Sequence, residues 1–108
     1  MLDISERKLA IIVLMAHEIG RAEAELRAFI ETLNEDEAAS LVAVYWIGRG
    51  TFEPEELAEA IRTAQQERKT PTADYLLGSP HFADHIEAGA AALDIELSDD
   101  EDDLMRGI

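Results

Sequence analysis

Proline and glycine punctuate the second half of this chain at intervals that favour short helices. Glu53-Pro54, Thr70-Pro71 and Ser79-Pro80 each place proline where a helix can begin, because the first helical turn does not need the N–H that proline lacks. Gly48 and Gly78 each follow an apolar run and are placed to end a helix, Gly48 as a left-handed terminal residue. No segment alternates polar and apolar residues as a half-buried strand would.

The first half of the chain carries the same helical signal. Asp3 with Glu6, and Asn34 with Glu37, have the spacing of a capping box. Between the two boxes, apolar residues recur at spacings of three and four, at Leu9, Ile12, Val13, Ala16, Ile19, Leu26, Phe29, Ile30 and Leu33. Gly20 would cost about 1 kcal/mol inside a helix. Residues 4–33 therefore form either one bent helix or two helices that meet near Gly20.

These patterns predict an all-α fold, a compact array of four to five short helices in one domain over residues 1–93. Beyond residue 33, the expected core-facing residues are Ala38, Leu41, Val42, Tyr45, Leu57, Ile61, Ala64, Leu76, Leu77, Phe82, Ile86, Ala90 and Leu93. Residues 94–108 hold seven acidic residues and one basic residue, Arg106. We expect this segment to be a disordered acidic tail.

The charge of the chain disfavours two classes of partner. There are 24 Asp and Glu against 9 Lys and Arg, which gives a net charge of −15. Such a charge repels nucleic-acid phosphates and anionic lipids and attracts basic surfaces. We therefore expect no nucleic-acid partner and no membrane partner, and we expect any protein partner to be basic.

The absence of cysteine excludes disulfides, thiolate metal sites and a cysteine nucleophile, and it fits a cytoplasmic location. The longest apolar run, Leu9 to Ala16, is far shorter than the roughly 20 residues that cross a bilayer.

Two longer runs resemble a bacterial protein family. One comprises residues 34–37, 41–43 and Trp46-Ile47-Gly48-Arg49-Gly50, and the other comprises residues 72–80, 83–84 and 87–89. Together they are similar to the domain of unknown function 3775, over about residues 26–93. The resemblance implies a small helical bacterial domain and brings no activity, cofactor or partner with it. The chain departs from the family pattern at Thr51, where an acid is usual, and at His81 and His85, where apolar or aromatic residues are expected.

The first candidate site is the turn Trp46–Gly50 together with Asp74 and Tyr75. A tryptophan at a helix end and an arginine between two glycines could form a partner-binding notch, because aromatic and arginine side chains dominate interface hot spots. The competing interpretation is structural. In it Trp46 caps the core, and Arg49 forms an ion pair with Asp74 or Glu53.

The second candidate is His81, Asp84 and His85. Positions i, i+3 and i+4 share one face of a helix, so two imidazoles and a carboxylate could bind one divalent metal. The competing interpretation places all three at the polar surface beside a buried Phe82–Ile86 stripe. Ser79, which precedes Pro80, is interpreted as a helix cap and not as a nucleophile.

The interpretation that we favour is a small acidic protein-interaction module that is not an enzyme and needs no cofactor. It would act through Trp46, Arg49, Asp74 and Tyr75. One alternative is a metal-assisted enzyme that uses the two histidines and Asp84. The other alternative is a self-associating domain, a homodimer that buries Tyr45, Trp46 or the first helix across a two-fold axis.

Overall fold

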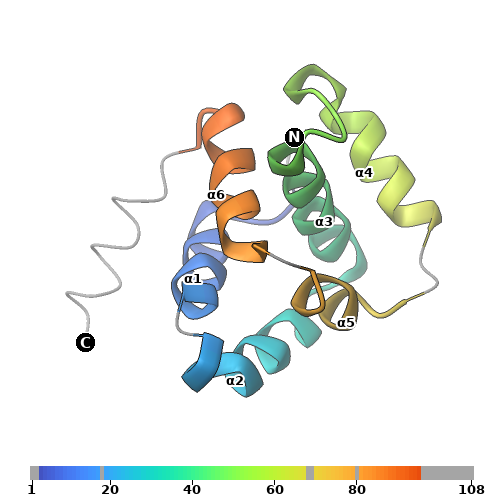
Figure 1. The fold of residues 1–108 in the computed structure, drawn as a ribbon. Helices are drawn as coiled ribbons and strands as arrows, with labels where there is room; N and C mark the ends of the chain where they lie inside the picture. The colour runs from blue at the N-terminus through green and yellow to red at the C-terminus, as the bar shows by residue number, and fades with distance from the viewer. Residues whose placement is uncertain (1–2, 18, 68–69, 80, 96–108) are drawn as a thin grey trace.

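The structure is a computed structural model that describes residues 3–17, 19–67, 70–79 and 81–95 (Figure 1). Within these ranges there are six α-helices, one short 3-10 helix and no strand. The elements are α1 (Glu6–His17), α2 (Ile19–Glu31), α3 (Glu35–Arg49), η1 (Pro54–Glu56), α4 (Leu57–Gln66), α5 (Thr72–Leu77) and α6 (Phe82–Ala92). The expected all-α class is confirmed, with one helix more than the four to five expected. Most of the predicted acidic tail, residues 96–108, lies outside the described residues.

Helix α3 is the centre of the fold. Every residue from 39 to 47 is buried, and a helix that is buried on all sides must be surrounded by other elements. Helices α6, α4 and α5 pack against it, and Figure 1 shows it in the middle of the molecule. Its one fully buried polar side chain, Ser40, accepts a hydrogen bond from the backbone N–H of Asp3 at 3.0 Å.

The first thirty residues form two helices. Helix α1 ends at His17 and α2 begins at Ile19, so the boundary lies just before the predicted position near Gly20. Helix α1 packs against α2 and α6. Its buried residues include the whole predicted stripe, Leu9, Ile12, Val13 and Ala16.

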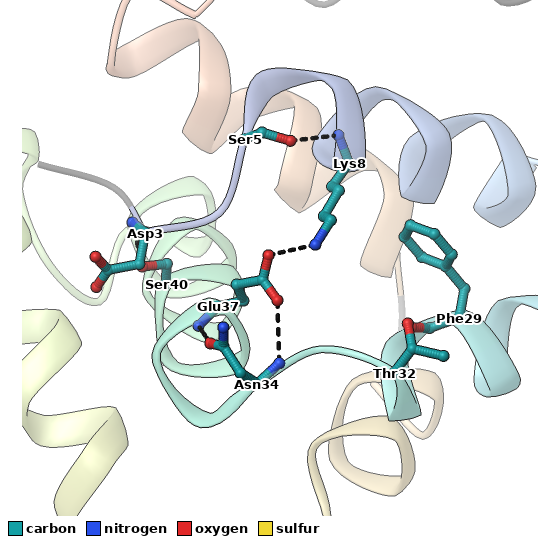
Figure 2. Close-up of polar contacts among 8 residues, drawn as sticks. All are labelled: Asp3, Ser5, Lys8, Phe29, Thr32, Asn34, Glu37 and Ser40. Atoms are coloured by element: carbon teal, nitrogen blue, oxygen red, sulfur yellow. Dashed lines mark hydrogen bonds and ion pairs between the residues drawn. The ribbon is translucent and has the colours of Figure 1, made fainter.

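One of the two predicted capping boxes is confirmed. The Asn34 side chain accepts from the N–H of Glu37 at 2.8 Å, and the Asn34 N–H donates to Glu37 Oε1 at 3.0 Å (Figure 2). The box predicted at Asp3 and Glu6 is wrong. Helix α1 begins at Glu6, and the Ser5 hydroxyl accepts from the N–H of Lys8. The backbone N–H of Asp3 donates to the Ser40 hydroxyl of α3 instead.

The predicted end of α3 at Gly48 is also wrong. Helix α3 continues to Arg49, and Gly50 is the left-handed residue, with φ of 88°. Gly48 lies inside the helix where the backbone of α6 passes close by. A Cβ at position 48 would lie 1.7 Å from the carbonyl oxygen of His85. Gly48 therefore allows two helices to touch, a requirement that local sequence does not report.

The predicted helix starts after proline agree with the structure to within about a residue. Pro54 is the first residue of η1, and Pro71 immediately precedes α5, while Pro80 lies outside the described residues. The prediction that Ser79 caps the next helix is wrong, because its hydroxyl donates to the carbonyl of Tyr75 at 2.8 Å. The residue before α6 is His81, which adopts a left-handed conformation with φ of 56°.

Candidate functional site

Trp46 of α3 and Tyr75 of α5 meet, as the first candidate site requires. The indole Nε1–H of Trp46 donates to the Tyr75 hydroxyl at 2.8 Å. Trp46 is 8% exposed and Tyr75 is half-buried. The Phe52 ring packs beside the indole, with 5.6 Å between centroids. The hydrogen bond and the Phe52 contact thus hold the two side chains in place relative to each other.

A pocket of about 180 Å³ lies against this aromatic pair. Val42, Trp46, Ala64 and Tyr75 give it apolar and aromatic walls, and Glu67, Thr70 and Thr72 add polar groups. Helices α3, α4 and α5 supply five of these residues, and Glu67 and Thr70 come from the segment between α4 and α5. The pocket therefore depends on the packing of three helices. We call it the Trp46 pocket.

Arg49 lies at the end of α3 and does not line the Trp46 pocket. Its side chain is exposed, and its guanidinium carbon stands 5.1 Å from the centroid of the Tyr45 ring. Its Nε–H donates to the Thr51 hydroxyl at 3.0 Å. The ion pair expected with Asp74 or Glu53 is not found among the residues described.

Asp74 pairs with Arg27 of α2, a residue that we did not single out from the sequence. The side chain of Asp74 is 53% exposed and that of Arg27 is 41% exposed. The hydrogen bond that Arg27 donates to Asp74 raises the pKa of Arg27, and the negative charges of Asp74, Glu31 and Glu23 also raise it. Asp74 therefore ties α5 to α2 and does not line the Trp46 pocket.

In the second candidate site, the rings of His81 and His85 lie edge to face, with 6.4 Å between their centroids. His81 Nδ1 and Asp84 Oδ2 are 3.9 Å apart, and both side chains are more than two-thirds exposed. The His85 ring packs edge-on against Tyr45, with 5.5 Å between centroids. A nearby hollow is lined by His81 and Asp84 but not by His85. Across the described residues, no group of three or more His, Asp or Glu side chains is arranged to hold a metal ion.

The surfaces suggested for self-association are partly used inside the chain. Tyr45 is 2% exposed and Trp46 is 8% exposed, so little of either side chain is available to a second copy.

No helix in the part of the chain that the structure describes is long and apolar enough to cross a membrane.

Sequence reasoning missed five residues of the Trp46 pocket, namely Val42, Ala64, Glu67, Thr70 and Thr72. Val42 and Ala64 were expected in the core by their spacing. The other three follow α4 or begin α5, and nothing in their local sequence distinguishes them from ordinary loop residues. They come together only when both α4 and α5 pack against α3.

A family model described as protein of unknown function (DUF3775) matches residues 23–95. The matched segment contains Trp46, Tyr75 and every other residue that lines the Trp46 pocket, and it leaves out α1. No curated protein and no solved structure matches the chain.

Proposed function

The chain belongs to the DUF3775 family of proteins of unknown function, and we propose that it is a bacterial, cytoplasmic protein-interaction module that binds its partner at the Trp46 pocket. The observation that carries this proposal is an open pocket whose aromatic walls are held in place by the Trp46–Tyr75 hydrogen bond. Tryptophan and tyrosine are enriched among the residues that dominate binding energy at interfaces.

The size of the pocket favours a protein side chain over a free small molecule. Small-molecule sites usually enclose roughly 300–1,000 Å³, whereas the Trp46 pocket has about 180 Å³. One side chain of a partner would fill it. Because Trp46 and Tyr75 are already fixed, the partner would not have to order them, which lowers the entropic cost of binding.

The chemistry of the pocket favours binding over catalysis. Among the described lining residues, Glu67 and Tyr75 are the titratable side chains, and these residues include no histidine, the most common general acid–base group. Arg49 lies one helical turn beyond Trp46 and is exposed. It would contribute at the edge of the interface, where its fork of donors can meet a partner's backbone or carboxylate.

Affinity capture from native bacterial lysate, with two matched pairs of variants, tests the proposal. Thr72→Phe would fill the pocket with a ring, and Thr63→Phe makes the same change on α4 at a residue that does not line the pocket. Arg49→Ala removes the exposed arginine, and Arg62→Ala removes an exposed arginine of α4.

We expect one protein to be enriched by wild type and by the Thr63 and Arg62 variants, lost with Thr72→Phe and reduced with Arg49→Ala. Equal capture by both threonine variants would contradict a binding site at the pocket. Circular dichroism of each variant establishes that the fold is retained.

A further inference from the structure

The walls of the Trp46 pocket combine three kinds of surface that suit a long cationic side chain. Val42 and Ala64 are aliphatic, Trp46 and Tyr75 are aromatic, and Glu67 carries a carboxylate. Glu67 is exposed, as is Thr70 beside it, while Val42, Trp46 and Ala64 are buried. The pocket is therefore apolar inside and has the Glu67 carboxylate at its solvent side.

We propose that the Trp46 pocket takes a single lysine or arginine side chain of the partner, an inference that rests on the proposed function. The methylene stem of such a side chain packs on aliphatic surface while its charged end stays near water. Here the stem would contact Val42 and Ala64. The cation would lie near the Trp46 and Tyr75 rings, whose π-faces attract positive charge, and the Glu67 carboxylate would accept a charge-assisted hydrogen bond.

The surroundings of the pocket strengthen this assignment. A second hollow shares Thr72 with the Trp46 pocket, and the exposed carboxylate of Glu31 lines it. The whole chain carries a net charge of −15, so the long-range field also draws in a basic partner.

Other occupants fit less well. An acidic side chain would meet Glu67 and the field of the whole chain, and both repel it. A purely apolar side chain would fill the inner part of the pocket but would gain nothing from Glu67 or from the π-faces. The charge complementarity thus selects a cation that has an apolar stem.

The single tryptophan of the chain makes the test specific. In the ¹⁵N-labelled full chain, the one indole N–H resonance reports directly on the pocket. The probes are the acetylated, amidated tripeptide Gly-Lys-Gly and its analogue with norleucine in place of lysine, which keeps the four-carbon stem and lacks the ammonium group. An arginine tripeptide is the third probe.

We expect the lysine and arginine peptides to shift the indole resonance at millimolar concentrations. The norleucine peptide should bind about tenfold more weakly, because it lacks the cation–π contact and the charged hydrogen bond. Glu67→Gln should weaken the lysine peptide several-fold and leave the norleucine peptide unchanged. Glu59→Gln, which makes the same charge change at an exposed residue of α4 outside the pocket, should have little effect on either.

Each outcome separates this inference from the proposed function. If norleucine and lysine peptides bind equally, or if Glu67→Gln and Glu59→Gln have equal effects, the cation assignment is overturned while the pocket remains a binding site. If no peptide moves the indole resonance, but Thr72→Phe still abolishes capture of the partner, the cation assignment also fails and the proposed function survives. If no peptide moves the indole resonance and the Thr72→Phe and Thr63→Phe variants capture the partner equally, both the cation assignment and the proposed function are wrong.

Discussion

A Cβ on Gly48 would lie 1.7 Å from the carbonyl oxygen of His85, so α3 and α6 touch backbone to backbone at this point. The same contact is made from the other side. A Cβ on Gly89 of α6 would lie 2.1 Å from the carbonyl oxygen of Val44. Two glycines, one on each helix, therefore set the distance between the central helix and the last one.

Replacing Gly48 by alanine should destabilise the fold severely. The added methyl meets backbone, which cannot move aside as a flexible side chain can, so we expect Gly48→Ala to lose about 3 kcal/mol or more of the free energy of unfolding. Gly50→Ala is the matched control. It meets nothing within 4 Å and suffers only from its φ of 88°, which costs about 1–2 kcal/mol. Urea unfolding followed by circular dichroism measures both, and equal losses would contradict the close approach.

Glu37 should make the stability of the fold depend on acid pH. Its carboxylate accepts hydrogen bonds from Lys8 and from the Asn34 N–H (Figure 2). The bond from Lys8, followed by that from Asn34, lowers the pKa of Glu37 from its ordinary value of 4.5. Because the folded pKa lies below the unfolded one, this contribution is complete above pH 4.5 and is lost as the pH falls through the folded pKa.

The measurement is the difference in free energy of unfolding between wild type and Glu37→Gln across pH 2–7. That difference should be constant near neutrality and should shrink on acidification. Using a difference removes the effect of the other carboxylates, whose mutual repulsion also weakens as they are protonated. A gap between wild type and Glu37→Gln that stays constant down to pH 2 would refute the assignment.

Asp74 should matter little for stability and not at all for the pocket. Its pair with Arg27 is largely exposed on both sides, and such pairs contribute about 1 kcal/mol or less. We expect Asp74→Asn to lose no more than this, and the loss to fade in about 1 M salt. Thermal melts at low and high salt measure the effect. A loss of several kcal/mol would contradict the assignment of a weak, exposed ion pair. A loss of partner capture would return Asp74 to the binding site.

The helices could be predicted from sequence because their signals are local. The Asn34–Glu37 box, the Pro54 start and the stripe of α1 each depend on residues within a few positions of one another, and each is found where the pattern puts it. The signals that failed involve distant partners. Asp3 was predicted to cap α1, but its backbone N–H donates to the hydroxyl of Ser40, 37 residues away. Gly48 was predicted to end α3, but it lies inside the helix because the backbone of α6 passes close to it.

The candidate site shows the same division. The sequence placed Trp46 and Tyr75 in one site, and they share a hydrogen bond. It also placed Arg49 with Asp74, but each has a different partner, Tyr45 for one and Arg27 for the other. Charge pairing between exposed side chains depends on which helix faces lie together, and residue spacing along the chain does not determine that.

The hydrogen bond between Trp46 and Tyr75 should be measurable as a stability term and as a spectral change. Tyr75→Phe leaves the mostly buried indole N–H of Trp46 without its acceptor, which should cost about 1–3 kcal/mol. The indole proton resonance should also move, because its hydrogen bond is lost. Chemical denaturation and the single indole signal are the two readouts. An unchanged resonance would mean that the bond is not formed in solution.

His81 offers a test of the backbone at the start of α6. Its φ of 56° and ψ of 33° are left-handed, a conformation that glycine adopts freely and alanine adopts at a cost of about 1 kcal/mol or more. We therefore expect His81→Gly to have a higher free energy of unfolding than His81→Ala by about 1 kcal/mol. At the exposed helical position Ala88 the order should reverse, because glycine is about 1 kcal/mol worse than alanine inside a helix. Comparing the two Gly–Ala pairs by denaturation isolates the backbone from any role of the imidazole. If alanine were the better residue at both positions, His81 would have to lie in a right-handed conformation, and α6 would begin at least one residue earlier than Phe82.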